Sequence, residues 1–105
     1  MAGDGAGDGA TDGSAAIAGP IFVTIANRKG LHARASAKFV NLASTFDAEV
    51  SVGHDGAIVS GTSILDLMML AASIGETIEI SATGPQAAAA IAELSGLVLG
   101  KFGED

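Results

Sequence analysis

The segment IFVTIANRKGLHARASAKFVNLASTF, residues 21–46, decides the fold expected for this chain. In residues 21–26, large apolar side chains fall at every second position, which is typical of a β-strand with one buried face. A polar turn follows at residues 27–30. Apolar residues then recur at spacings of three and four from Leu31 to Phe46, which predicts an amphipathic helix. The segment is therefore expected to form a strand, a tight turn and a helix.

The rest of the chain continues to alternate between strand and helix patterns. Residues 48–52 and 57–60 predict two strands joined by a glycine-containing turn, which is a hairpin. Ser63 and Asp66 have the spacing of a capping box, which starts a second helix that runs to about residue 73. Residues 76–83 alternate as a fourth strand, and an alanine-rich helix follows Pro85 to about residue 99. The predicted order is βαββαβα.

Strands with one apolar and one polar face need helices on one side of the sheet and water on the other. We therefore predict an α+β two-layer domain, with a four-stranded antiparallel sheet and three helices on one face. Periodicity leaves the strand order open, because a ferredoxin-like arrangement and other orders share this sequence of elements.

Length and composition exclude several classes of protein. The chain has 105 residues, no cysteine and no apolar run long enough to cross a bilayer, so we expect one small domain over residues 21–105. Residues 1–20 hold six of the fifteen glycines and three aspartates, which predicts a disordered tail. That tail has neither the apolar core of a secretory signal nor an arginine-rich transit pattern, so we expect the protein in the cytoplasm.

The charge of the chain is unevenly distributed. Five basic and twelve acidic residues give a net charge of −7, which argues against nucleic-acid or anionic-membrane partners. Four of the five basic residues nevertheless lie within residues 28–38, together with His32. Such a cationic island on an acidic protein is suited to binding one small anion.

His32 stands where the turn after the first strand becomes the first helix, and none of the usual capping residues occupies this position. An open helix N-terminus attracts anions and disfavours a protonated imidazole, so His32 is expected to be neutral and nucleophilic near pH 7. Arg34, two residues later, can grip a phosphoryl group with its guanidinium fork. The pattern predicts a site that carries a phosphoryl group on histidine without a metal or other cofactor. The alternative is an exposed histidine and a solvated arginine.

Residues 27–36, NRKGLHARAS, resemble the phosphohistidine motif of the phosphocarrier HPr family. Residues 59–68, VSGTSILDLM, resemble the family's second, serine-containing motif, and the resemblance spans residues 21–100. It implies an open-faced β-sandwich. It also implies that His32 accepts a phosphoryl group on Nδ1 from phosphorylated enzyme I and passes it to an enzyme IIA domain, with Arg34 as the phosphate clamp.

Ser63 has two interpretations. It is predicted to cap the second helix, with Asp66 reaching back to complete the capping box. The resemblance also suggests regulatory phosphorylation of Ser63 by an HPr kinase/phosphorylase. Asp66 replaces the glycine usual in this motif, and its negative charge should oppose that modification.

Four consecutive large apolar residues at positions 67–70 exceed what one helix face can bury, so some of them are expected to be exposed. In the family this helix lies beside the active histidine and binds partner proteins. The expected partner-binding residues are Arg28, Lys38, Leu67, Met68 and Leu70. The methionines could instead fill the edge of a small core. His54 lies in the hairpin turn and is assigned no role.

Two function classes stay open. The leading hypothesis is a phosphoryl relay through His32, serving either sugar transport or a regulatory, nitrogen-type branch of the phosphotransferase system. The second motif favours regulation because it resembles α-proteobacterial forms. The alternative is a regulatory binding module that acts through the Met-rich helix without phosphoryl transfer. An autonomous hydrolase or metal enzyme is not expected, because neither a nucleophile–base pair nor a three-ligand cluster is apparent. A monomer is expected for a carrier that moves between partners.

Overall fold

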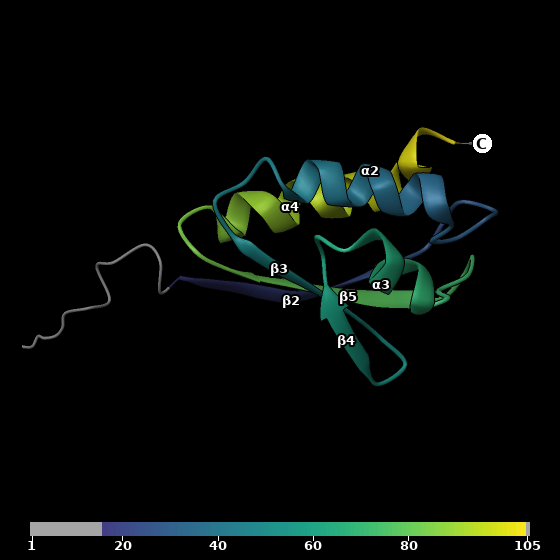
Figure 1. The fold of residues 1–105 in the computed structure, drawn as a ribbon, viewed down its shortest axis with the longest axis horizontal. Helices are drawn as coiled ribbons and strands as arrows, with labels where there is room; N and C mark the ends of the chain where they lie inside the picture. Colours follow the sequence, from purple (N-terminus) through teal and green to yellow (C-terminus); the bar gives the residue numbers. More distant parts are fainter. Residues whose placement is uncertain (1–15, 105) are drawn as a thin grey trace, which may run out of the picture.

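The computed structural model describes residues 16–104 and has two layers, a sheet and a layer of helices (Figure 1). Its elements follow the predicted order βαββαβα, with a short 3-10 helix at the end. They are β2 (Ile17–Thr24), α2 (Ala33–Ala43), β3 (Glu49–His54), β4 (Ala57–Ser60), α3 (Ile64–Met69), β5 (Thr77–Thr83), α4 (Ala87–Leu99) and η3 (Lys101–Gly103). No helix in residues 16–104 is long and apolar enough to cross a membrane.

The four strands form one antiparallel sheet in the order β2-β5-β3-β4. The last strand in the sequence, β5, therefore lies between the first two. This arrangement answers the question that periodicity left open, and it is the open-faced sandwich that the family resemblance implied.

The alternation of side chains separates the two faces of the sheet as predicted. Val23, Val52 and Ile80 are buried beneath the helices, whereas Phe22 and Ile58 are 67% and 72% exposed on the opposite face. Figure 1 shows α2 and α4 lying together over the same side of the sheet. The α+β fold class is thus confirmed.

The first strand begins earlier than predicted. The composition places residues 17–20 in the tail, but they belong to β2, where Ile17 pairs with Thr83 and Ala18 with Ala82. Gly19 permits this extension, because it has a φ of +85° and a β-carbon at this position would lie 2.6 Å from the carbonyl oxygen of Ile80. The irregular register between Ala18 and Ile21 accommodates Pro20 on an edge strand, where a missing N–H costs little. The prediction for residues 1–15 lies outside the described residues.

The second helix is shorter than predicted. It ends at Met69 and not near residue 73, because Ala71 adopts a left-handed conformation with a φ of +55°. The chain then turns toward the loop before α2, where the Leu31 N–H donates to the carbonyl oxygen of Ala72 over 3.0 Å. The early end of α3 thus supplies a backbone acceptor that fixes the start of α2.

Candidate functional site

The turn at residues 27–31 positions the start of α2. Gly30 has a φ of +63°, and a β-carbon there would overlap the carbonyl oxygen of Ala72. The buried Asn27 side chain donates from Nδ2 to the carbonyl oxygen of Gly30 over 2.8 Å. Leu31, which is 4% exposed, anchors the end of the turn in the core. The turn is therefore held by backbone and side-chain contacts on both sides.

His32 is the N-cap residue of α2, as the sequence predicted. Its backbone is extended, and its side chain makes no capping hydrogen bond. The first backbone N–H of α2 that makes an intrahelical hydrogen bond is that of Ser36, which donates to the carbonyl oxygen of His32. The preceding N–H groups of the first turn have no intrahelical acceptor, and the positive end of the helix dipole lies with them. The helix N-terminus is thus suited to binding an anion.

The imidazole of His32 lines a cleft of about 630 Å³ at this end of the molecule. The expected residues Arg28, Arg34 and Lys38 all line this cleft, and Lys29 joins them. Within residues 16–104, no carboxylate lies within 4.0 Å of the Arg34 guanidinium. The cationic island of the sequence is therefore gathered around one histidine that is 26% exposed.

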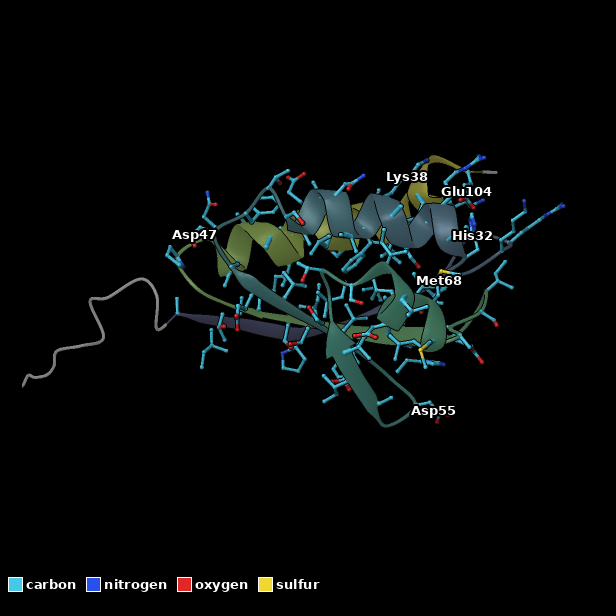
Figure 2. The ribbon with its side chains drawn as sticks, in the orientation of Figure 1. His32, Lys38, Asp47, Asp55, Met68 and Glu104 are labelled. Carbon is cyan, nitrogen blue, oxygen red and sulfur yellow. The ribbon has the colours of Figure 1, made fainter. Side chains whose placement is uncertain are left out.

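Glu104 also enters this cleft, although no sequence motif identifies it as a site residue. Its Oε2 lies 2.5 Å from His32 Nε2, and its Oε1 accepts from Asn27 Nδ2 over 3.0 Å. Figure 2 shows His32, Lys38 and Glu104 together at the end of the molecule opposite Asp47. Both oxygens of this carboxylate are thus engaged, one by the turn and one by the histidine.

The segment after α4 places Glu104. The Phe102 side chain is buried in the core at 1% exposure, and Lys38 Nζ donates to the carbonyl oxygen of Phe102 over 2.6 Å. The Glu104 N–H donates to the carbonyl oxygen of Lys101 over 2.8 Å. The burial of Phe102 and the bond from Lys38 therefore hold this segment against the rest of the domain, and the turn closed by Lys101 directs Glu104 toward His32.

Partial burial tends to raise the pKa of the Glu104 carboxyl, but other interactions outweigh it. Hydrogen bonds with Asn27 and His32, together with the positive charge of Lys38, hold this pKa below its ordinary value. Glu104 is consequently a carboxylate at neutral pH. Within residues 16–104, it is the one carboxylate among the side chains that line the cleft.

Replacing Glu104 with glutamine is expected to destabilise the fold at pH 7 but not in acid. The pKa of Glu104 is lower in the folded chain than in the unfolded chain, so the unfolded state binds more protons as the pH falls. The stabilisation is complete above the ordinary glutamate pKa of about 4.3 and disappears below the folded value. Urea unfolding of both proteins in a pH series from 7 down to 2 measures this difference, with exposed Glu93→Gln as control. A difference that stays constant throughout the series would contradict the expectation.

His54 does not lie in a solvated turn, as the sequence suggested. It ends β3, and its side chain is only 14% exposed. Its Nδ1 lies 3.2 Å from the carbonyl oxygen of Thr77, and its Nε2 lies 3.3 Å from Glu76 Oε1. His54 thus fastens the β3–β4 hairpin to the start of β5, away from the cleft. No group of three histidine, aspartate or glutamate side chains within residues 16–104 is arranged to hold a metal ion.

Comparison with known proteins agrees with this geometry. A family model described as "PTS HPr component phosphorylation site" matches residues 22–99. The chain belongs to the HPr family. The phosphocarrier protein HPr of Cupriavidus necator is 44% identical over 81 residues, which are 77% of this chain and 91% of that protein. The phosphocarrier protein NPr of Shewanella violacea is 44% identical over 82 residues, covering 78% of this chain and 90% of that protein.

Solved HPr structures share the fold. HPr-C-His from Thermoanaerobacter tengcongensis is 38% identical, with a TM-score of 0.80, and the match covers 84% of this chain and 99% of that one. The chain therefore has the general role of an HPr-type phosphocarrier in the phosphotransferase system, whose members interact with the enzymes of that system.

The second HPr motif forms the cap of α3. Ser63 Oγ accepts from the Asp66 N–H over 3.2 Å, as predicted for a capping residue. The reverse half of the capping box is not formed, because the Ser63 N–H turns instead to the carbonyl oxygen of Ser60 at 3.4 Å. The Asp66 carboxylate is therefore not held by Ser63.

The predicted partner surface on α3 needs correction. Leu67 is fully buried and Leu70 is 7% exposed, so both belong to the core and neither offers a docking surface. The prediction failed for these two residues because α3 turns them toward α2 and the sheet. Met68 is 39% exposed, as the prediction requires. Its exposed apolar neighbours are Ile64, Leu65 and Met69, of which Met69 is 73% exposed.

Proposed function

We propose that His32 Nδ1 accepts a phosphoryl group from phosphorylated enzyme I and passes it to an enzyme IIA domain. The observation that carries this proposal is the position of His32 at the open N-terminus of α2, inside a cleft lined by four cations. Its Nε2 is engaged by Glu104, whereas its Nδ1 makes no hydrogen bond to any group in residues 16–104. The nucleophile that remains is the nitrogen on which the family resemblance places the phosphate.

The surroundings of His32 suit a group with two negative charges. Backbone N–H groups of the first turn and the helix dipole supply fixed positive partial charges. The exposed Arg34 lines the cleft, and its guanidinium can bind two phosphoryl oxygens at once. Because phosphoryl transfer depends mainly on positioning and charge stabilisation, these parts supply what the reaction needs from the carrier.

The test is a phosphorylation assay with phosphoenolpyruvate and enzyme I. We expect one acid-labile phosphate on His32, seen by phosphorus NMR and by mass, and none on His32→Gln. His54→Gln serves as the matched control and should be labelled like the starting chain. An unlabelled starting chain, with active enzyme I and a folded protein, would overturn the proposal and favour a binding module that acts through α3.

Arg34→Gln is expected to slow phosphoryl transfer about tenfold to a hundredfold, because a hydrogen bond to a charged group contributes about 1.5–3 kcal/mol. Arg34→Lys should recover part of the rate, since it restores the charge but not the bidentate geometry. Single-turnover labelling by phosphorylated enzyme I measures both rates. Unchanged transfer in Arg34→Gln would remove Arg34 from the site.

The partner that accepts the phosphoryl group needs a surface on which to dock. We propose that an enzyme IIA domain docks on Met68 and its exposed neighbours on α3, with Arg28 and Lys38 facing acidic groups of the partner. Methionine side chains adapt to more than one partner. We also propose action as a monomer in the cytoplasm, where phosphoenolpyruvate is supplied.

We propose the regulatory, nitrogen-type branch as the destination of the phosphoryl group. HPr and NPr relatives match this chain at similar identity, so identity does not separate the two branches. The support for the nitrogen-type branch comes from the second motif and from the presence of NPr proteins among the relatives. Competition between nitrogen-type and sugar-type enzyme IIA domains for the phosphorylated chain tests this choice. Faster transfer to the sugar-type domain would overturn it.

Regulation at Ser63 is a separate proposal. The hydroxyl is half-buried and caps α3, and the Asp66 backbone N–H is its donor. Incubation with HPr kinase/phosphorylase and ATP should label Ser63 more readily in Asp66→Gly than in the starting chain, because one nearby negative charge is removed. Equal labelling of the two would show that Asp66 does not oppose the modification.

A further inference from the structure

The carboxylate of Glu104 is at first sight misplaced, because it stands in a cleft suited to an anion. Four cations line this cleft with it: Arg28, Lys29, Arg34 and Lys38. A carboxylate beside an incoming phosphoryl group costs electrostatic energy. Yet the buried Phe102 side chain, the bond from Lys38 to the Phe102 carbonyl oxygen and the donor Asn27 hold Glu104 in this position. The arrangement therefore needs a function that offsets this repulsion.

The contact between Glu104 and His32 suggests what the function of this carboxylate is. Glu104 is a carboxylate at neutral pH and can only accept a hydrogen bond. At 2.5 Å from Glu104 Oε2, Nε2 of a neutral His32 must carry the ring proton, because a bare nitrogen would face a negative oxygen. The other ring nitrogen, Nδ1, is then left with a lone pair. We propose that Glu104 is a positioning residue that holds the proton on His32 Nε2 before and after phosphorylation.

This inference rests on the proposed function and deepens it. In the forward step, the Nδ1 lone pair forms the new N–P bond while the P–N bond of the phosphorylated donor breaks and its electron pair returns to the donor ring. Nε2 keeps its proton throughout, so the phosphorylated ring becomes cationic and the Glu104 carboxylate balances that charge. When the phosphoryl group is passed on from His32, the N–P bond breaks and its electron pair returns to the ring. A ring protonated on Nε2 then leaves as neutral imidazole, which is a better leaving group than imidazolate.

Asn27 holds the Glu104 side chain in the conformation that this role requires. Its amide Nδ2 donates both to the carbonyl oxygen of Gly30 and to Glu104 Oε1, at 2.8 and 3.0 Å. The residue that fixes the turn before His32 therefore also fixes the carboxylate that orients the imidazole. The position of the ring and the position of its proton are set by one buried side chain.

The first test reads the proton directly and needs no enzyme I. Long-range ¹H–¹⁵N NMR of the full chain, at a pH where the imidazole is neutral, should show the Nε2–H tautomer of His32. Glu104→Ala should shift the tautomer ratio toward Nδ1–H, whereas the exposed-site control Glu93→Ala should not. An unchanged ratio in folded Glu104→Ala would overturn the inference.

The second test reads the reaction. Glu104→Ala should be phosphorylated about tenfold to a hundredfold more slowly, as expected when a charged hydrogen bond is lost. Phosphorylated Glu104→Gln should also hydrolyse more slowly than the starting chain at neutral pH, because its ring gives up the Nε2 proton more easily. Faster phosphorylation of Glu104→Ala would overturn the inference and identify the carboxylate as a competitor of the phosphoryl group. If the starting chain takes no phosphate, the proposed function fails, while the tautomer ratio still decides whether Glu104 holds the proton.

Discussion

Gly30→Ala is expected to destabilise the fold and to disable the cleft at the same time. The positive φ of Gly30 costs an alanine about 1–3 kcal/mol, and the overlap of its β-carbon with the Ala72 carbonyl oxygen adds to this. Relief of the overlap must move either the turn or the loop after α3, and both position His32. Because a shift of about 1 Å can reduce a rate a hundredfold, we expect phosphoryl transfer to fall at least tenfold.

Gly56→Ala is the matched control for this prediction. Gly56 also has a positive φ, of +85°, but a β-carbon there would meet nothing within 4 Å. Urea unfolding and single-turnover labelling of both variants separate backbone strain from the overlap at Ala72. Equal losses of stability and rate in the two variants would show that the contact between the turn and Ala72 has no effect of its own.

Phe102→Ala is expected to have the largest effect on stability. Phe102 is 1% exposed, and removal of a buried phenylalanine side chain lowers the free energy of unfolding by about 3–5 kcal/mol. For a domain of this size, the melting temperature should fall by more than about 10 °C. The same change should release Glu104, because Phe102 anchors the segment that carries it. Thermal unfolding and the NMR tautomer ratio of His32 measure the two consequences.

Phe22→Ala provides the comparison within the same chain. Phe22 has the same side chain but is 67% exposed on the open face of the sheet, so its removal creates no cavity. We expect its stability to change far less than that of Phe102→Ala, and the His32 tautomer ratio to stay unchanged. A similar fall in melting temperature for both variants would contradict the assignment of Phe102 to the core.

The fold is largely accessible from the sequence because each element has a local pattern. Strand alternation separates Val23 from Phe22. Helix periodicity identifies Ala35 and Phe39 on the buried face of α2 but misses Ser36 and Ala43, and the helix ends at Ala43, before Phe46. The N-cap position of His32 follows from its place between turn and helix. Each of these inferences depends on residues that are close in the sequence.

The errors arise where contacts between distant residues decide the outcome. Gly19 and Pro20 indicate a break, yet pairing with β5 carries β2 through them. The four apolar residues at positions 67–70 predict some exposure, but only the packing of α3 reveals that Leu67 and Leu70 are buried.

Glu104 in the cleft also could not be predicted from local sequence patterns. It lies 72 residues after His32, and no spacing rule connects the two. One signal is present, because a glycine-flanked phenylalanine after α4, in Gly100–Gly103, indicates a chain that turns back sharply. That signal predicts a turn but does not identify what the turn reaches.

Because of the direction of β2, the described chain begins at the end of the molecule that lies away from the His32 cleft. The described chain enters at Ala16, next to Ile17, which pairs with Thr83, whereas His32 lies at the opposite end of the molecule (Figure 2). Attachment to a sensor surface through the amino-terminal side should therefore leave the cleft accessible to partner proteins. Attachment through the segment after η3 would instead place the support beside His32, because Glu104 of that segment contacts this side chain. Binding measurements on this protein should accordingly be made with amino-terminal attachment.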